Sequence, residues 1–225
     1  MTAPIVHHMF FDTEAKPPDM TLWDGLALDY KDNEPGFQWR NLAKKPQRAA
    51  PVCVAWALDD GPVSSSMDPL DFARDLFRAR QWAKAEGSKL LLVAFNIKYD
   101  LTLTWLWLCG VNDAAARMFS GYLPGVGPGE TTKPWNLDVK ECQPVPYIGM
   151  EDLCARLGIK SKASGIHGGD VMRLVWSGQI TEALRYCEGD VRDLRALFLR
   201  LCATHVGFNL PAWAQRPAAD DEVTQ

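Results

Sequence analysis

Two acidic side chains stand one residue apart, directly after an apolar stretch near the start of the chain. In the segment 8–16, HMFFDTEAK, the run MFF is followed by Asp12 and Glu14. Alternate residues of a strand face the same side, so both carboxylates would lie side by side. Like charges near a core repel each other and lose hydration unless a cation compensates. A hard divalent cation, Mg²⁺ or Mn²⁺, suits carboxylate oxygens; the plainer alternative is a solvated strand end.

A second acidic candidate lies in the segment 94–101, AFNIKYDL. Asn96 ends an apolar run, and Asp100 follows four residues later. If a helix begins here, Asn96 is its cap, and the Asp100 carboxylate lies near the end of the preceding strand. The alternative is an acidic residue that only stabilises the first turn of a helix through its dipole.

The third candidate is a tyrosine and an aspartate in RYCEGDVRDL. Tyr186 and Asp190 are four residues apart and would share one face of a helix. A phenol and a carboxylate one turn apart can hold a water molecule and a metal ion together. Gly189 costs about 1 kcal/mol in a helix relative to Ala, but it would let another group approach closely. The alternative for Tyr186 is an amphipathic core residue.

These side chains need strands and helices to bring them together. The apolar and turn patterns predict a strand over 5–14, a hairpin of two strands over 51–67, a buried strand over 89–96 and a short strand around 135–139. Asp68 as a cap and Pro69 at the first helical position predict a helix that ends at Gly87.

Two further segments are predicted to be helical. The segment DLTLTWLWLC, 100–109, contains a Leu-Thr-Leu-Thr alternation that suits a strand, yet Ile97, Leu101, Trp105 and Leu108 also recur at helical spacing. We predict a helix, because a strand directly after a buried strand would need a turn that the sequence does not provide. Residues 150–205 are predicted to be mainly helical. This order of elements predicts an α/β domain with a mixed sheet of about five strands flanked by helices.

The composition is that of an ordinary globular protein. The 225 residues are 47% apolar and 23% charged, with a formal net charge of −4. An acidic chain is not expected to coat nucleic acid through its overall charge, so a nucleic-acid partner must be held by local basic groups or by metal ions. The six cysteines form no zinc-binding spacing and are expected to be buried free thiols.

Taken in order, the three motifs resemble a known family. D-x-E on a first strand, N-x-x-x-D after an internal strand and Y-x-x-x-D on a late helix resemble the 3′–5′ exonucleases of the DnaQ-like superfamily, which have an RNase H-like fold. The tyrosine resembles that of the tyrosine (DEDDy) branch. The chain is similar to predicted exonucleases related to the proofreading domain of family B DNA polymerases, on the stretch GDVMRLVWSGQITEALRYCEGDV, 169–191. The resemblance covers roughly residues 5–203.

The resemblance implies a two-metal-ion 3′–5′ exonuclease. It implies that two divalent cations, Mg²⁺ or Mn²⁺, are bound by Asp12, Glu14, Asp100 and Asp190, and that Tyr186 orients the attacking water. The expected partner is the 3′ end of single-stranded DNA or RNA, with DNA favoured, and the expected product is a nucleoside 5′-monophosphate. A protein of replication or repair would fit as a further partner.

Substrate contacts are expected around these motifs. The predicted contacts are Thr13, Asn96, Lys98, Lys160 and Lys162. Further basic candidates are Arg40, Lys44, Lys45 and Arg48, and the candidates for base stacking are Phe11 and Trp39. The alternative for the lysines is a solvated surface.

The domain organisation is expected to be simple. We predict one exonuclease domain over 1–205, with an irregular insertion at 16–50, and a flexible tail at 206–225. No run is long enough to span a bilayer, and the N-terminus lacks the pattern of a signal peptide. We therefore expect no membrane partner, and a location in the cytoplasm of a bacterial or phage-infected cell.

Three other functions are open on the sequence alone. A catalytically silent binding module on the same fold would usually lack one of the acids, all of which are present. An endonuclease, such as a ribonuclease H or a junction resolvase, would cut a circular single strand. A phosphodiesterase for short oligonucleotides would be recognised from its products across substrate lengths.

Overall fold

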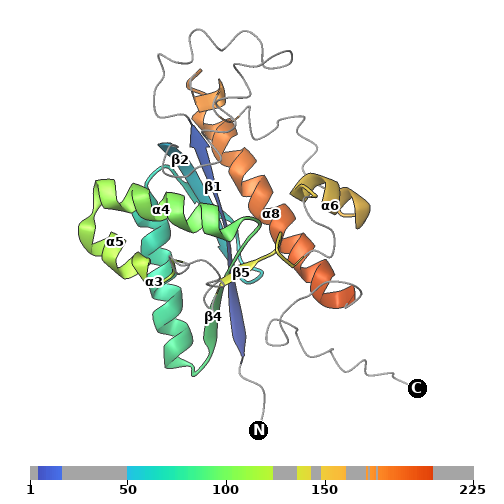
Figure 1. Cartoon of the computed structure of the whole chain (residues 1–225), viewed down its shortest axis with the longest axis horizontal. Helices are drawn as coiled ribbons and strands as arrows, with labels where there is room; N and C mark the ends of the chain where they lie inside the picture. Colours follow the sequence, from blue (N-terminus) through green and yellow to red (C-terminus); the bar gives the residue numbers. More distant parts are fainter. Residues whose placement is uncertain are drawn as a thin grey trace.

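The computed structural model describes residues 5–16, 50–123, 136–142, 148–160, 171, 173–175 and 177–204. These residues form one five-stranded mixed sheet flanked by helices (Figure 1). The predicted α/β class is therefore confirmed, and the arrangement is compatible with an RNase H-like fold. Most of the expected insertion at 16–50 and the expected tail at 206–225 lie outside the described residues.

The sheet has the strand order β3-β2-β1-β4-β5. Its strands are β1 (Val6–Lys16), β2 (Ala50–Leu58), β3 (Ser64–Ser66), β4 (Lys89–Ala94) and β5 (Asn136–Asp138). The first three form an antiparallel meander, in which β2 and β3 are the hairpin that the sequence predicts. β4 joins the other edge of β1 in parallel, and β5 joins β4 in parallel. β1 is therefore the central strand, with a neighbour on each side.

Helices cover both faces of this sheet. The described helices are α3 (Pro69–Ala85), α4 (Ile97–Val111), α5 (Asp113–Ser120), α6 (Met150–Arg156) and α8 (Ile180–Thr204). Asp68 caps α3 as predicted, because its carboxylate accepts the Leu70 N–H at 2.9 Å. Gly87 follows the helix with a φ of +70°, which glycine adopts readily. The helical choice for the segment after β4 is confirmed.

Two hydrophobic cores lie on opposite faces of the sheet. One core joins Phe11 and its neighbours on β1, β2 and β4 to α3, α4 and α5. The other joins Phe10 and its neighbours to α6 and α8 (Figure 1). Alternate residues of β1 thus enter different cores. Phe11 is fully buried and stacks on Phe72 with ring centroids 5.2 Å apart, so the expectation that it stacks a base was wrong.

The cysteines follow the expectation with one exception. Five of the six are buried and all six are free thiols, but Cys109 on α4 is exposed. None of the helices in the described part of the chain is both long and apolar enough to cross a membrane.

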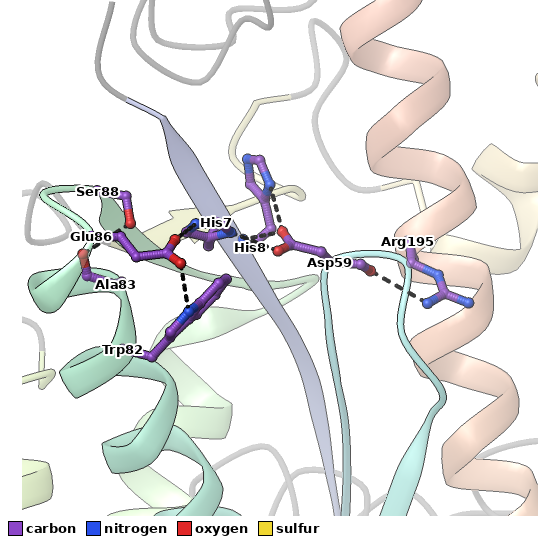
Figure 2. A network of polar contacts seen from close by, with 8 residues as sticks. All are labelled: His7, His8, Asp59, Trp82, Ala83, Glu86, Ser88 and Arg195. Atoms are coloured by element: carbon purple, nitrogen blue, oxygen red, sulfur yellow. Dashed lines mark hydrogen bonds and ion pairs between the residues drawn. The ribbon is translucent and has the colours of Figure 1, made fainter.

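A polar network ties the start of β1 to the β2–β3 turn and to α8, as Figure 2 shows. The Asp59 carboxylate contacts His7 Nδ1 at 2.8 Å and accepts the main-chain N–H of His8 at 2.8 Å. Arg195 on α8 donates to the main-chain oxygen of Gly61 at 2.7 Å. Burial alone would raise the pKa of Asp59, but the hydrogen bonds from His8 and His7 outweigh it and lower the pKa to about 2. The network lies at the opposite end of β1 from Asp12 and Glu14.

Candidate active site

Asp12 and Glu14 lie on the part of β1 that extends beyond its parallel neighbour, β4. β4 pairs with β1 only as far as Phe10, whereas β2 continues beside Asp12 and Glu14. The two carboxylates therefore stand at an edge where the sheet opens, with neither side chain fully buried. The spacing predicted that they share a face, and both line the same cavity.

This cavity brings four distant parts of the chain together. Its volume is about 410 Å³, and its walls come from the end of β1, the start of α4, the start of α6 and the first half of α8. All five side chains predicted to be catalytic line it: Asp12, Glu14, Asp100, Tyr186 and Asp190. The structure thus brings together the three motifs that the sequence singled out.

Three of the acids form a tight cluster. Asp12, Glu14 and Asp190 each offer a carboxylate oxygen, and these oxygens lie within 4.8 Å of one another. Oxygen-only ligands of this kind suit a hard divalent cation. The donor set therefore fits the metal ion that the sequence predicts, and the cluster could bind one.

Asp100 is the fourth acid and is the most deeply buried of them, at 4% exposure. Burial raises its pKa, and the neighbouring charges of Asp12 and Asp138 raise it further. Main-chain hydrogen bonds from Thr13 and Asn96 act in the opposite direction. Like charges gathered in a buried place are unfavourable without a counter-ion, so a cation here would relieve the repulsion.

Two tyrosines face these acids. Tyr186 on α8 is buried, and burial together with the charges of Asp190 and Glu14 raises its pKa above the usual range. Tyr99 on α4 also lines the cavity, and burial and the charge of Asp100 raise its pKa as well. Both phenols therefore stay protonated at neutral pH and can donate a hydrogen bond. No separate signal in the sequence pointed to Tyr99.

The start of α6 forms a wall that sequence reasoning missed. Gly149, Met150, Glu151 and Asp152 all line the cavity. The two acids belong to the first turn of α6 and are exposed. The signal in the sequence was weak, because an acidic first turn is common in helices for reasons of dipole alone.

The predicted substrate contacts divide into two groups. Thr13 and Asn96 line the cavity. Thr13 is buried, with its hydroxyl 3.0 Å from that of Thr104, whereas Asn96 is exposed. Lys98 pairs with Glu141 at 2.7 Å, and neither Lys98 nor the exposed Lys160 is among the described residues that line the cavity. Their roles stay predictions.

The remaining candidates lie outside the described residues. These are Lys162, Arg40, Lys44, Lys45, Arg48 and Trp39.

A further buried acid, Asp138, was not foreseen. It is the last residue of β5 and is 5% exposed. One oxygen accepts the Ile97 N–H at 3.1 Å, and the other accepts the N–H groups of Lys140 and Glu141 at 3.0 and 3.3 Å. Burial and the charge of Glu141 raise its pKa to about 6, although these hydrogen bonds oppose the rise.

Comparisons with known proteins give little beyond this geometry. No family model matches the chain, and no curated protein matches it. Among solved structures, the chain is similar to the family B DNA polymerase from the hyperthermophilic archaeon Pyrobaculum calidifontis, with 17% sequence identity and a TM-score of 0.48. The match covers 95% of this chain and 28% of the polymerase chain, so this chain spans less than a third of that protein.

Proposed function

We propose that the chain is a two-metal-ion 3′–5′ exonuclease that removes nucleoside 5′-monophosphates from single-stranded nucleic acid, with DNA favoured. The observation that carries the proposal is the cluster of Asp12, Glu14 and Asp190, whose oxygens lie within 4.8 Å of one another. Asp100 and Tyr186 line the same cavity. These residues lie in the three motifs that resemble the tyrosine branch of the DnaQ-like superfamily, and in the same order along the chain.

Four carboxylates suit two divalent cations, Mg²⁺ or Mn²⁺. Asp12, Glu14 and Asp190 would hold one ion, and Asp100 together with Asp12 would hold the other. Bound cations would lower the pKa of a water molecule and stabilise the charge that develops during phosphodiester hydrolysis. Four negative and four positive charges cancel, so the cavity can accept an anionic backbone although the whole chain has a net charge of −4.

The role of Tyr186 follows from the protonation state of its phenol. Its phenol stays protonated at neutral pH, because burial and the charge of Asp190 raise its pKa. It therefore cannot take a proton from water, but it can hold water by a hydrogen bond and aim it at the phosphorus. The same helix carries Asp190 one turn further on, so water and metal ligand are held by one rigid element.

The rest of the cavity suits the terminal nucleotide. Phe95, Tyr99 and Met150 supply apolar surface near the acids, and Asn96 supplies an exposed amide. Aromatic surfaces stack on any base, so such a site tolerates different sequences. A 3′-terminal nucleotide held there would place its phosphodiester beside the carboxylates.

The test is a cleavage assay with labelled single strands. The purified protein is incubated with 5′-labelled DNA and RNA in Mg²⁺, Mn²⁺ or EDTA, beside Asp12→Ala and the exposed control Asp60→Asn. We expect a ladder that shortens from the 3′ end, needs metal, persists in Asp60→Asn and disappears in Asp12→Ala. Circular single-stranded DNA should resist.

Three results would contradict the proposal. Wild-type activity in Asp12→Ala would remove the carboxylate cluster from the reaction. Cleavage of circular DNA would identify an endonuclease on the same fold. If neither strand is cleaved while Mn²⁺ still raises the unfolding temperature, the ions bind but the substrate is of another class.

A further inference from the structure

The N-terminus of α4 is capped from outside the helix. Asn96 occupies the N-cap position, as the sequence predicts, but its side chain makes no capping hydrogen bond. The first N–H of the helix, that of Ile97, instead donates to Asp138 Oδ2 at 3.1 Å in a buried setting. The capping carboxylate therefore comes from β5, 41 residues further along the chain.

Asp138 is itself held in place on several sides. Its second oxygen accepts the N–H groups of Lys140 and Glu141, which follow it in the chain. Asp138 pairs with Ala94 at the end of the β4–β5 ladder, and the next residue, Val139, donates to the Ala94 oxygen at 2.9 Å. Its position is thus fixed by the sheet, at the point where the chain leaves β4 for α4.

This arrangement links the sheet directly to two residues of the candidate site. The Asn96 side chain makes no capping hydrogen bond; it is exposed and lines the cavity. Asp100 lies one turn after Asn96, and its own N–H donates to the Asn96 oxygen at 3.1 Å. Any shift of the first turn of α4 would therefore move Asp100 relative to Asp12 on β1.

We propose that Asp138 is a positioning residue of the candidate site, which fixes the first turn of α4 and so the places of Asp100 and Asn96 relative to Asp12. A buried carboxylate is unfavourable unless it is well hydrogen-bonded, and here three main-chain N–H groups and the positive end of a helix meet it. The inference rests on the metal site of the proposed function, but not on the exonuclease activity that is proposed for that site.

The test compares Asp138→Ala and Asp138→Asn with a variant that removes the cap of another helix. Asp68→Ala removes the cap of α3, a hydrogen bond of 2.9 Å on an exposed helix end that does not line the cavity. Mn²⁺ binding is measured by calorimetry on metal-free protein, beside thermal unfolding and the Mn²⁺ dependence of single-strand cleavage.

The expected results separate positioning from simple stability. Asp138→Ala should weaken Mn²⁺ binding by about 10-fold or more, the scale for groups that orient metal ligands. It should lower kcat while KM for DNA changes little. Asp138→Asn should lie between wild type and Ala, because an amide oxygen can still accept the Ile97 N–H. Asp68→Ala should lower the unfolding temperature and leave Mn²⁺ affinity unchanged.

Each outcome decides the inference. Wild-type Mn²⁺ affinity in Asp138→Ala, or in Asp138→Asn if the alanine variant does not fold, would overturn it. A wild-type protein that binds Mn²⁺ but cleaves no strand, while Asp138→Ala loses the ion, would support the role of Asp138 and reject the exonuclease. If the wild-type protein cleaves DNA and the Asp138 variants cleave it with the same Mn²⁺ dependence, the exonuclease would be supported and the role of Asp138 rejected. A wild-type protein that binds no Mn²⁺ would overturn both.

Discussion

The sulfur of Cys187 lies 3.7 Å from the Asp12 carboxylate oxygen Oδ2 and 3.6 Å from the main-chain oxygen of the same residue. Cys187 directly follows Tyr186 on α8 and is fully buried. Burial raises the pKa of its thiol, and its contact with Cys53 and the charge of Asp12 raise it further. The thiol therefore stays protonated and acts as a weak hydrogen-bond donor that orients an acid of the candidate metal cluster.

Removal of this donor should weaken metal binding. We expect Cys187→Ala to lower Mn²⁺ affinity by at most about 10-fold, at the weak end of the range for groups that orient metal ligands. Cys202→Ala removes another buried thiol from the same helix and serves as the control. Calorimetry on both variants checks the expectation, and equal Mn²⁺ affinity in the two would refute it.

Replacement of Tyr186 by Phe should separate chemistry from metal binding. The variant keeps the ring and all four carboxylates, so Mn²⁺ affinity should be unchanged. Loss of the hydroxyl should lower kcat by less than about 100-fold, the low end of the range for groups that transfer a proton, because Tyr186 only holds and orients the water. Single-turnover cleavage and calorimetry measure the two quantities, and a parallel loss of both would place Tyr186 among the groups that hold the metal.

The buried acids should make the metal-free protein more stable in mild acid. The pKa values of Asp100 and Asp138 are raised by burial, so the folded state binds more protons than the unfolded state near pH 6. In EDTA, the free energy of unfolding should therefore fall as the pH rises from about 5 to 8. Chemical denaturation across this range tests it. Asp100→Asn should reduce the slope, and a slope that it leaves unchanged would count against the raised pKa of Asp100.

At lower pH, Asp59 should make the free energy of unfolding depend on pH in the opposite direction. Its pKa is about 2 in the folded protein, below the ordinary value of 3.8, so its contribution is complete above about pH 4 and is lost as the pH falls toward 2. The side chain is 25% exposed, and we expect a contribution of about 1–2 kcal/mol after solvent screening.

Comparison of wild type with Asp59→Asn measures this contribution. The difference in unfolding free energy should be largest near pH 5 and should shrink toward pH 2. A difference that stays constant across this range would mean that His7 and His8 do not hold the carboxylate in its charged form.

Local periodicity explains which parts of the site could be predicted. Alternation within one strand pairs Asp12 with Glu14, and the helical repeat pairs Tyr186 with Asp190, so both pairs are visible in the sequence. Phe11 was misjudged because alternation gives the face on which a residue lies, but not whether a helix covers that face. Here α3 covers it.

Asp138 shows what the sequence could not reveal. Its strand has three residues, too short for a pattern, and its partner Ile97 is 41 residues away. Nothing near Asn96 in the sequence indicates that another carboxylate caps the helix. The wall formed by α6 was missed for a similar reason, because its place beside α8 depends on packing across the domain.

Because the β1–β4 ladder ends early, a main-chain N–H group of β1 can bond to a side chain of the candidate site. β4 pairs with β1 only as far as Phe10, and the N–H of Thr13 beyond it reaches the Asp100 carboxylate. Every residue except proline carries this donor. Substitutions at position 13 that fit the buried site beside Thr104 should therefore preserve this contact, and proline should break it for reasons of backbone chemistry.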